Sequence, residues 1–276
     1  MARRPLALAA LALLTTAAAV LVWFVALGIP RGRALDVSAM LTFGGVATPP
    51  LQPKILGVAH LADPVPLLIG TVLLAGIALL RRRPLMALLV PLIIGGANLT
   101  TQLLKPALAD VRLIEVHGVG TVYPGSWPSG HATAAMTLAL GLVLVVGPRL
   151  RAPAALVGAA YAITVGYALV ALGFHLPSDV LGGYLVAATF TLLGAAALAA
   201  LEARHPERAR PVHAPAPLPA LAAGGGLLAL GGAVALIAAP GVTLTALEHP
   251  AALAAGIGIA VLGLTLTAGL ALALRR

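Results

Sequence analysis

Residues 64–104 read PVPLLIGTVLLAGIALL, then RRR, then PLMALLVPLIIGGANLTTQLL, so two apolar runs are separated by three arginines. Each run approaches the roughly 20 residues that an α-helix needs to cross a bilayer. Of the 276 residues, 61% are hydrophobic and 9% are charged, whereas soluble domains carry about 25% charged residues. A soluble fold is excluded, because it could not hide so much apolar surface from water. The absence of cysteine excludes disulfides and thiolate chemistry.

Eight segments are predicted to span the membrane, which defines the fold class as all-α integral membrane protein. The apolar residues are chiefly Ala, Leu, Val and Gly, which suit closely packed helices better than strands. The first run exceeds the roughly 7–15 apolar residues of a signal peptide, so we interpret it as an anchor. The predicted spans are residues 6–29, 64–80, 85–104, 131–147, 154–174, 179–201, 218–239 and 250–273.

The basic residues follow the positive-inside rule. With the N-terminus inside, 12 of the 17 Lys and Arg residues fall in inside loops and 5 in outside loops. The net charge of +9 therefore orients the helices, with both termini in the cytoplasm. No basic stretch is interleaved with aromatic residues as a nucleic-acid surface would be. We expect membrane lipids around the chain and no nucleic-acid partner.

Three more polar segments divide the chain. Residues 31–63 are expected outside, as a loop with one short amphipathic helix on the membrane surface. Residues 105–130 form a second outside loop, and residues 202–217 form a cytoplasmic linker rich in Pro, Arg and His. We predict a six-helix core over residues 1–201, followed by the linker and a C-terminal two-helix hairpin over residues 218–276.

The other ionisable side chains gather at the outer membrane boundary, where such groups are costly and suggest function. Lys105 and Arg112 follow the third span, seven residues apart, although Pro106 limits how continuous a helix between them can be. Together they would attract an anion, while either one alone also fits a cation that snorkels to the boundary. Asn98, Thr101 and Gln102 precede Lys105 along one helical stripe, which we interpret as interhelical hydrogen bonding rather than a path for a polar head group.

Two predicted helix starts supply histidines at the same boundary. Ser129 is a favourable N-cap for the helix that begins with His131, and the free N–H groups of that turn attract anions. Pro177 suits the first turn of the next helix, where Asp179 can reach back to His175 and leave its other ring nitrogen as nucleophile or base. The residues alone leave two alternatives open: a simple cap beside a boundary histidine, and a His–Asp pair that only completes a helix start.

These residues resemble the type 2 phosphatidic acid phosphatase superfamily of integral membrane lipid phosphatases, whose motifs are K-x6-R-P, P-S-G-H and S-R-x5-H-x3-D. Lys105 and Arg112 match the first motif, residues 128–131 match the second, and His175 and Asp179 match the third. The resemblance covers residues 85–201 and includes motif order, spacing and membrane side.

The resemblance implies a six-helix core with its site at the outer edge of the bilayer, and a reaction without metal or cofactor. It implies that His175 attacks phosphorus to form a phosphohistidine. Asp179 would orient His175, and His131 would protonate the departing oxygen. The phosphate-binding residues that it implies are Lys105, Arg112, Ser129 and Gly130.

The chain departs from these motifs at two points. Leu113 replaces the proline of the first motif, and Ala168 and Leu169 replace the Ser-Arg of the third. The missing arginine is one of three cations expected to hold the phosphate, and losing such a donor commonly costs about 10²–10³ in rate. His117 and His60 are the candidates to compensate for it.

Two functions follow from this sequence. The first is hydrolysis of the phosphate monoester or pyrophosphate of a polyprenyl or phosphatidyl lipid on the outer membrane face. The alternative is a non-hydrolytic binder or transporter of lipid phosphates, motivated by Leu169. The Ala-, Arg- and Gly-rich composition suggests a GC-rich bacterial genome, and hence the bacterial inner (plasma) membrane. The lipid and the oligomeric state stay open.

Overall fold

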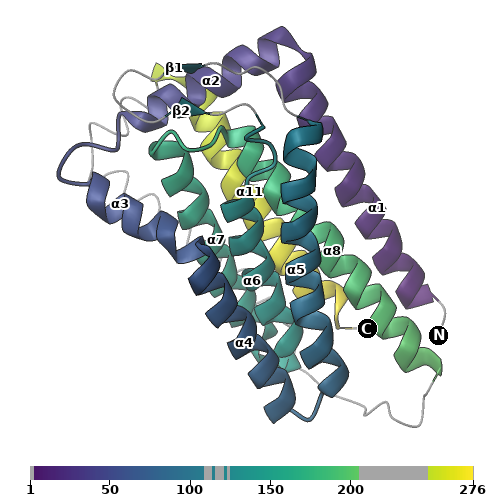
Figure 1. The fold of residues 1–276 in the computed structure, drawn as a ribbon. Coiled ribbons are helices and arrows are strands. Elements are labelled where there is room, and N and C mark those ends of the chain that lie inside the picture. The colour runs from purple at the N-terminus through teal and green to yellow at the C-terminus, as the bar shows by residue number, and fades with distance from the viewer. Residues whose placement is uncertain (1–2, 109–113, 116–120, 123–124, 205–247, 276) are drawn as a thin grey trace.

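The structure, a computed structural model, describes residues 3–108, 114–115, 121–122, 125–204 and 248–275. They form a bundle of long helices, and the helix α2 (Pro30–Gly44) crosses one end of it (Figure 1). The N- and C-termini lie at the opposite end (Figure 1). Following the predicted topology, we call the end with α2 the outer end and the end with the termini the inner end.

The long helices of the bundle run between these two ends. They are α1 (Arg3–Trp23), continued by the π-helix η1 (Phe24–Gly28), α4 (Pro64–Leu80), α5 (Pro84–Ala107), α6 (Gly130–Val145), α7 (Arg151–Ala171), α8 (Pro177–Arg204) and α11 (Pro250–Ala273). The short elements are α2, α3 (Gln52–Ala59), the 3-10 turns η2 (His60–Ala62) and η3 (Pro148–Leu150), and the strands β1 (Ile114–Glu115) and β2 (Thr121–Val122). The strands pair antiparallel, with Ile114 opposite Val122 and Glu115 opposite Thr121.

The six-helix core was predicted correctly. Each of its helices agrees with a predicted span to within three residues at either end. Of the predicted C-terminal hairpin, the second helix is α11 with the predicted bounds. The predicted span 218–239 and most of the predicted linker lie outside the described residues, so the division into core, linker and hairpin stays a prediction.

The described helices define a multi-pass membrane protein. Five of them are long and apolar enough to cross a bilayer, and the pair Gln52–Ala62 and Pro64–Leu80, bent by 49°, is a sixth candidate. α6 has only 16 residues, but it lies between α5, α7 and α8 and buries most of its side chains in protein. The other helices carry the exposed leucines, such as Leu13 on α1 and Leu88 on α5, that face lipid.

Small residues bring the central helices close together, as in other membrane bundles. A Cβ added at Gly158 of α7 would lie 3.0 Å from the Cβ of Ala139 on α6. Tyr184 of α8 is completely buried, and its hydroxyl donates to the carbonyl oxygen of Ala162 on α7. The centre of the bundle therefore tolerates little change in side-chain volume.

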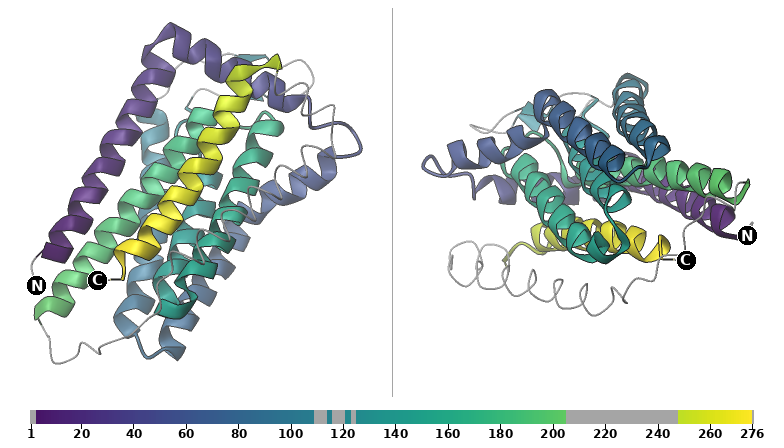
Figure 2. Two further views of the ribbon diagram at one scale, coloured as in Figure 1. Left: turned by 180° about the vertical axis from the view of Figure 1, so that it is seen from behind. Right: turned by 90° about the horizontal axis from the view of Figure 1, so that it is seen from below.

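α11 packs along α7 and α8 (Figure 2). The hydroxyl of Tyr167 on α7 donates to the carbonyl oxygen of Gly256 on α11 over 2.8 Å. Ile259 of α11 is completely buried against this surface. The C-terminal helix is thus part of the same packed body as the core.

Residues 31–63 contain more structure than predicted. The prediction of a loop with a single short helix is wrong, since α2, α3 and η2 occupy most of this segment. α2 begins with Pro30, whose fixed φ favours a first helical turn, and it buries Ala39 and Met40 against the bundle. Contacts with the rest of the bundle therefore stabilise α2. The weak hydrophobic pattern of residues 31–63 does not reveal these contacts.

Arginines at the inner end bind the carbonyl groups of helix C-termini. Arg151 is mostly buried and donates to the carbonyl oxygen of Leu274, just after α11, over 2.6 Å. Arg81 donates to the carbonyl oxygen of Val145 at the end of α6, and Arg83 pairs with Glu202 of α8 at 3.0 Å. Arg81 and Arg151 thus complete helix ends whose last carbonyl groups otherwise lack partners, in addition to their predicted role in orientation.

We expect Arg151→Ala to destabilise the protein by about 1–3 kcal/mol, because it removes a charged hydrogen bond to a part-buried carbonyl group at the end of α11. The measurement is the temperature at which half of the detergent-solubilised protein precipitates. Arg149→Ala, two residues earlier and exposed, is the matched control and should change this temperature little. Equal effects of the two substitutions would contradict the helix-end role of Arg151.

Candidate active site

The two candidate catalytic histidines lie together at the outer end of the bundle. His131 is in the first turn of α6, and His175 lies in the loop that joins α7 to α8. Their ring centroids are 6.5 Å apart. Two residues 44 positions apart in the sequence therefore lie in one small region, as predicted from the ionisable side chains at the outer membrane boundary.

Lys105, in the last turn of α5, lies beside the start of α6. A Cβ added at Gly130 would be 3.8 Å from the Nζ of Lys105 and 3.1 Å from the Nε2 of Gln102. The absence of a side chain at Gly130 thus keeps space open between the ammonium group and the first N–H groups of α6, where an anion is favoured. Arg112, the other predicted phosphate-binding cation, lies outside the described residues.

His175 is held by Asp179, as the spacing predicted. The His175 Nδ1 and Asp179 Oδ2 atoms are 3.4 Å apart, and Asp179 is completely buried. The Leu176 N–H donates to the same carboxylate oxygen over 3.1 Å. A carboxylate that is ionised can only accept hydrogen bonds, so with Asp179 in that form the proton of this contact is on the His175 Nδ1 and Nε2 keeps a lone pair. Nε2 has no hydrogen-bond partner among the described residues.

A tight turn at the end of α7 places His175. Gly173 has a φ of 69°, a left-handed conformation that glycine adopts without strain. The N–H groups of Phe174 and His175 then both lie within hydrogen-bonding distance of the carbonyl oxygen of Leu169, at 3.0 and 3.4 Å. Pro177 begins α8 immediately afterwards. The loop is therefore fixed by backbone bonds on both sides of the histidine.

Leu169, which stands where the third motif has arginine, is completely buried in the apolar core. Its side chain supplies no cation to the site. Of the two candidates to compensate for that arginine, His117 lies outside the described residues. The other, His60, is bound to a carboxylate and is described below.

Ser129 caps α6, as predicted, and also connects α6 to α8. Its hydroxyl accepts from the Ala132 N–H over 3.2 Å, and its own backbone N–H donates to the carbonyl oxygen of Asp179 over 2.9 Å. The Thr133 hydroxyl contacts the Ser129 carbonyl oxygen at 2.8 Å and the Thr101 hydroxyl on α5 at 3.1 Å. The polar stripe on α5 thus makes the predicted interhelical hydrogen bond through Thr101.

Two adjacent glycines allow α8 to approach the start of α6. A Cβ at Gly182 would lie 2.6 Å from the indole of Trp127, and a Cβ at Gly183 would lie 2.6 Å from the carbonyl oxygen of Ser129. No side chain fits at such distances. The sequence His175 to Gly183 therefore combines the histidine, its carboxylate and the close contact that aligns them with α6.

Two acidic residues from the outer segment, residues 31–63, also contact residues of the site. Asp63, directly before α4, lies 3.0 Å from the His131 Nε2 through Oδ1 and 2.7 Å from the His60 Nδ1 through Oδ2. Asp36 of α2 accepts from the Ser178 N–H over 3.0 Å and from its hydroxyl. Sequence reasoning missed both acids, because the contacts connect segments 68 and 142 residues apart.

The Asp63 carboxylate is ionised at neutral pH. Burial raises the pKa of Asp63, but the hydrogen bonds with His60 and His131 lower it by more, so the pKa lies below its usual value. His60 thus contacts Asp63, and the Asp63 carboxylate lies between His60 and His131. It is not a replacement for the missing arginine.

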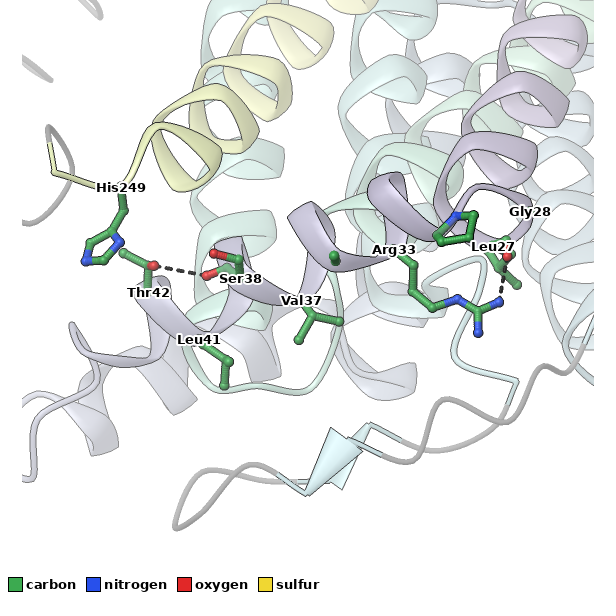
Figure 3. A pocket seen from close by; sticks show the side chains of 10 residues that line it. Leu27, Gly28, Arg33, Val37, Ser38, Leu41, Thr42 and His249 are labelled. Carbon is green, nitrogen blue, oxygen red and sulfur yellow. Dashed lines mark hydrogen bonds between the residues drawn. The ribbon is translucent and has the colours of Figure 1, made fainter.

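Within the described ranges, no group of three or more His, Asp or Glu side chains has the arrangement of a metal site. A cavity of about 910 Å³ lies on another face of α2, between this helix, the end of η1 and His249 (Figure 3). Arg33 borders it and donates to the carbonyl oxygen of Leu27 over 2.6 Å. None of the predicted catalytic residues is among the described residues that line this cavity.

The chain is similar to known proteins in part of its sequence and in its fold. Residues 84–202 match the model of the PAP2 superfamily. The fold is similar to the crystal structure of a transmembrane PAP2-type phosphatidylglycerolphosphate phosphatase from Bacillus subtilis, with a TM-score of 0.51 and 24% identity over 75% of this chain and 99% of that one. No curated protein sequence matches the chain.

Gly183→Ala should destabilise the protein by about 1–3 kcal/mol, the usual cost of overpacking, because the added methyl group collides with the backbone at Ser129. The measurement is thermal unfolding followed by tryptophan fluorescence, since Trp127 packs against this contact. Gly95→Ala on α5, where no neighbour lies within 4 Å of an added Cβ, is the control. If both variants unfold at the wild-type temperature, the contact does not limit the approach of α8.

Proposed function

We propose that this protein is a membrane lipid phosphatase in which His175 attacks the phosphorus of a lipid phosphate. The observation that supports this most is the contact between His175 and Asp179, which uses Nδ1 of His175 and leaves its Nε2 without a partner among the described residues. The His175 ring also lies near the His131 ring, with 6.5 Å between the ring centroids. The relative from Bacillus subtilis is named as a phosphatase of a lipid phosphate, which supports a substrate of that class.

In the first step, the lone pair of the His175 Nε2 forms a bond to phosphorus while the bond from phosphorus to the lipid oxygen breaks. His131, as imidazolium, transfers a proton to that oxygen, and the lipid leaves as an alcohol when the substrate is a monoester. The buried Asp179 carboxylate offsets the positive charge that develops on the His175 ring. The product is a phosphohistidine.

In the second step, water attacks the phosphohistidine. His131, now neutral, takes a proton from this water, and the N–P bond returns its electron pair to the His175 Nε2. Inorganic phosphate leaves, and both histidines regain their starting protonation. The cycle consumes one water and needs no other reactant.

The charge of the transferring phosphoryl group is balanced by Lys105 and by the free N–H groups of the first turn of α6, with Gly130 and Ser129 at the contact. Such fixed donors are the main contribution that an enzyme makes to phosphoryl transfer. We include Arg112 in this set from its motif position. With Leu169 in place of the third cation, we expect slower turnover than a full set of three would give.

We further propose that the site faces the outside of a bacterial inner (plasma) membrane, with both termini in the cytoplasm. The support is the charge asymmetry of the loops, together with the position of both termini at the end opposite α2 (Figure 1). The substrate is then a polyprenyl or phosphatidyl lipid whose phosphate lies in the outer leaflet.

The test is a phosphate-release screen of purified protein against phosphatidic acid, phosphatidylglycerol phosphate and undecaprenyl phosphate and pyrophosphate. His175→Ala should lower the rate by about 10³-fold or more, as expected for loss of a nucleophile. Radioactive phosphate should be trapped on the wild type, and not on this variant, when the reaction is stopped by denaturation at alkaline pH, where phosphohistidine is stable. His249→Ala, at the cavity on α2, is the matched control and should keep wild-type activity. Unchanged hydrolysis in His175→Ala would exclude the assigned nucleophile.

The alternative function is binding or transport of lipid phosphates without hydrolysis, favoured by the buried Leu169. In that case, no lipid in the screen would release phosphate. Reconstituted vesicles would instead show translocation of a lipid phosphate, and His175→Ala would retain it.

A further inference from the structure

We infer that Asp63 is a positioning residue that favours lipid phosphate monoesters over lipid pyrophosphates as substrates. The inference rests on the proposed function, since it assigns a specificity to the same site. It begins from the contact between His131 and Asp63, a residue that lies outside all three family motifs.

One carboxylate connects two histidines. Asp63 Oδ1 lies 3.0 Å from the His131 Nε2, and Oδ2 lies 2.7 Å from the His60 Nδ1. His131 and Asp63 are about equally exposed, at 38% and 35% of their side-chain surfaces, and His60 is exposed at 58%. The contacts therefore lead from His131, through Asp63, to the more exposed His60. With Nε2 bound to Asp63, Nδ1 is the nitrogen of His131 that faces no protein partner among the described residues.

The position of Asp63 does not have an ordinary structural explanation. It is the N-cap residue of α4, where aspartate usually accepts hydrogen bonds from the second or third N–H of the helix. Here its side chain makes no such bond. Pro66 in the third helical position has no N–H, and both carboxylate oxygens turn to the histidines instead.

Asp63 is also the described group that favours a positive charge on His131. The Asp63 Oδ1 atom lies 3.0 Å from the His131 Nε2, and an ionised carboxylate at this distance favours the charged form of an imidazole. His131 thus depends on Asp63 to be the imidazolium that the first step requires.

The two substrate classes differ in how much they need this imidazolium. In a monoester the leaving oxygen becomes an alkoxide unless the His131 Nδ1 proton reaches it as the P–O bond breaks. In a pyrophosphate the leaving group is a lipid phosphate, a stable anion that departs without a proton. Throughout either reaction Asp63 stays a carboxylate, with no proton transferred to it.

The charge of Asp63 acts in the same direction. A departing lipid phosphate is negatively charged, and only the His131 ring separates it from the Asp63 carboxylate. The two like charges repel each other. A departing alcohol carries none. Both effects make Asp63 helpful to monoester cleavage and unhelpful to pyrophosphate cleavage.

The test uses dioleoyl phosphatidic acid and dioleoylglycerol pyrophosphate, which share a diacylglycerol and differ in the leaving group. Initial rates of phosphate release are measured in the same detergent micelles. Asp63→Asn should lower kcat about 10- to 100-fold on phosphatidic acid, in line with loss of general acid catalysis. On the pyrophosphate, kcat should fall less than 3-fold or rise. The ratio of the two rates should therefore shift by at least about 3-fold.

Three other variants complete the experiment. Asp63→Ser, also neutral and a good N-cap, should shift the ratio in the same way, so the result does not depend on one variant folding. Asp63→Glu should return the ratio toward wild type. Asp36→Asn, which weakens the α2 contact with Ser178, is the matched control and should lower both rates by the same factor.

An equal loss on both lipids in Asp63→Asn and Asp63→Ser would overturn the inference and leave Asp63 as a structural residue. A wild type that hydrolyses neither lipid nor any other lipid of the screen would instead overturn the proposed function. The two failures are therefore distinguishable.

Discussion

The hydrogen bond from the Ser129 N–H to the Asp179 carbonyl oxygen, at 2.9 Å, joins the starts of α6 and α8. It forms only because Gly182 and Gly183 let the helices approach closely. His131 and His175 lie on either side of this junction. Their separation is thus set by backbone atoms, which move less than side chains, and phosphoryl transfer depends strongly on such positioning.

Around this junction the described part of the chain carries few charges. Lys105 comes from α5, Asp179 from α8, and Asp63 and Asp36 from the outer segment. Each acid meets a residue that the site needs: Asp179 meets His175, Asp63 meets His131, and Asp36 meets Ser178. At the inner end, Arg81 and Arg151 bind helix carbonyl groups. All of these charged residues except Asp36 therefore lie at or beside a helix end, where they contact backbone groups or histidines.

Much of the fold was predictable from the sequence, because lipid makes the signal of a spanning helix strong. The bounds of α4 and α11 were predicted without error. The His175–Asp179 pair was predictable as well, since both residues lie within one turn of a predicted helix start. The Asp63–His131 contact was not predictable, because it depends on how α4 packs beside α6, which no local pattern specifies. Likewise α2 was mistaken for part of a loop, because Ala39 and Met40 count as core only once the bundle beneath them is known.

The burial of α6 has a consequence for how the protein responds to its surroundings. Helices that face lipid tilt when the bilayer thins or thickens. α6 carries His131 but is enclosed by α5, α7 and α8, so bilayer thickness acts on it only through those neighbours. Because α8 is bound to its start by backbone atoms, the two histidines would move together as one rigid unit. The reacting geometry is in this way insulated from the composition of the membrane that supplies its lipid.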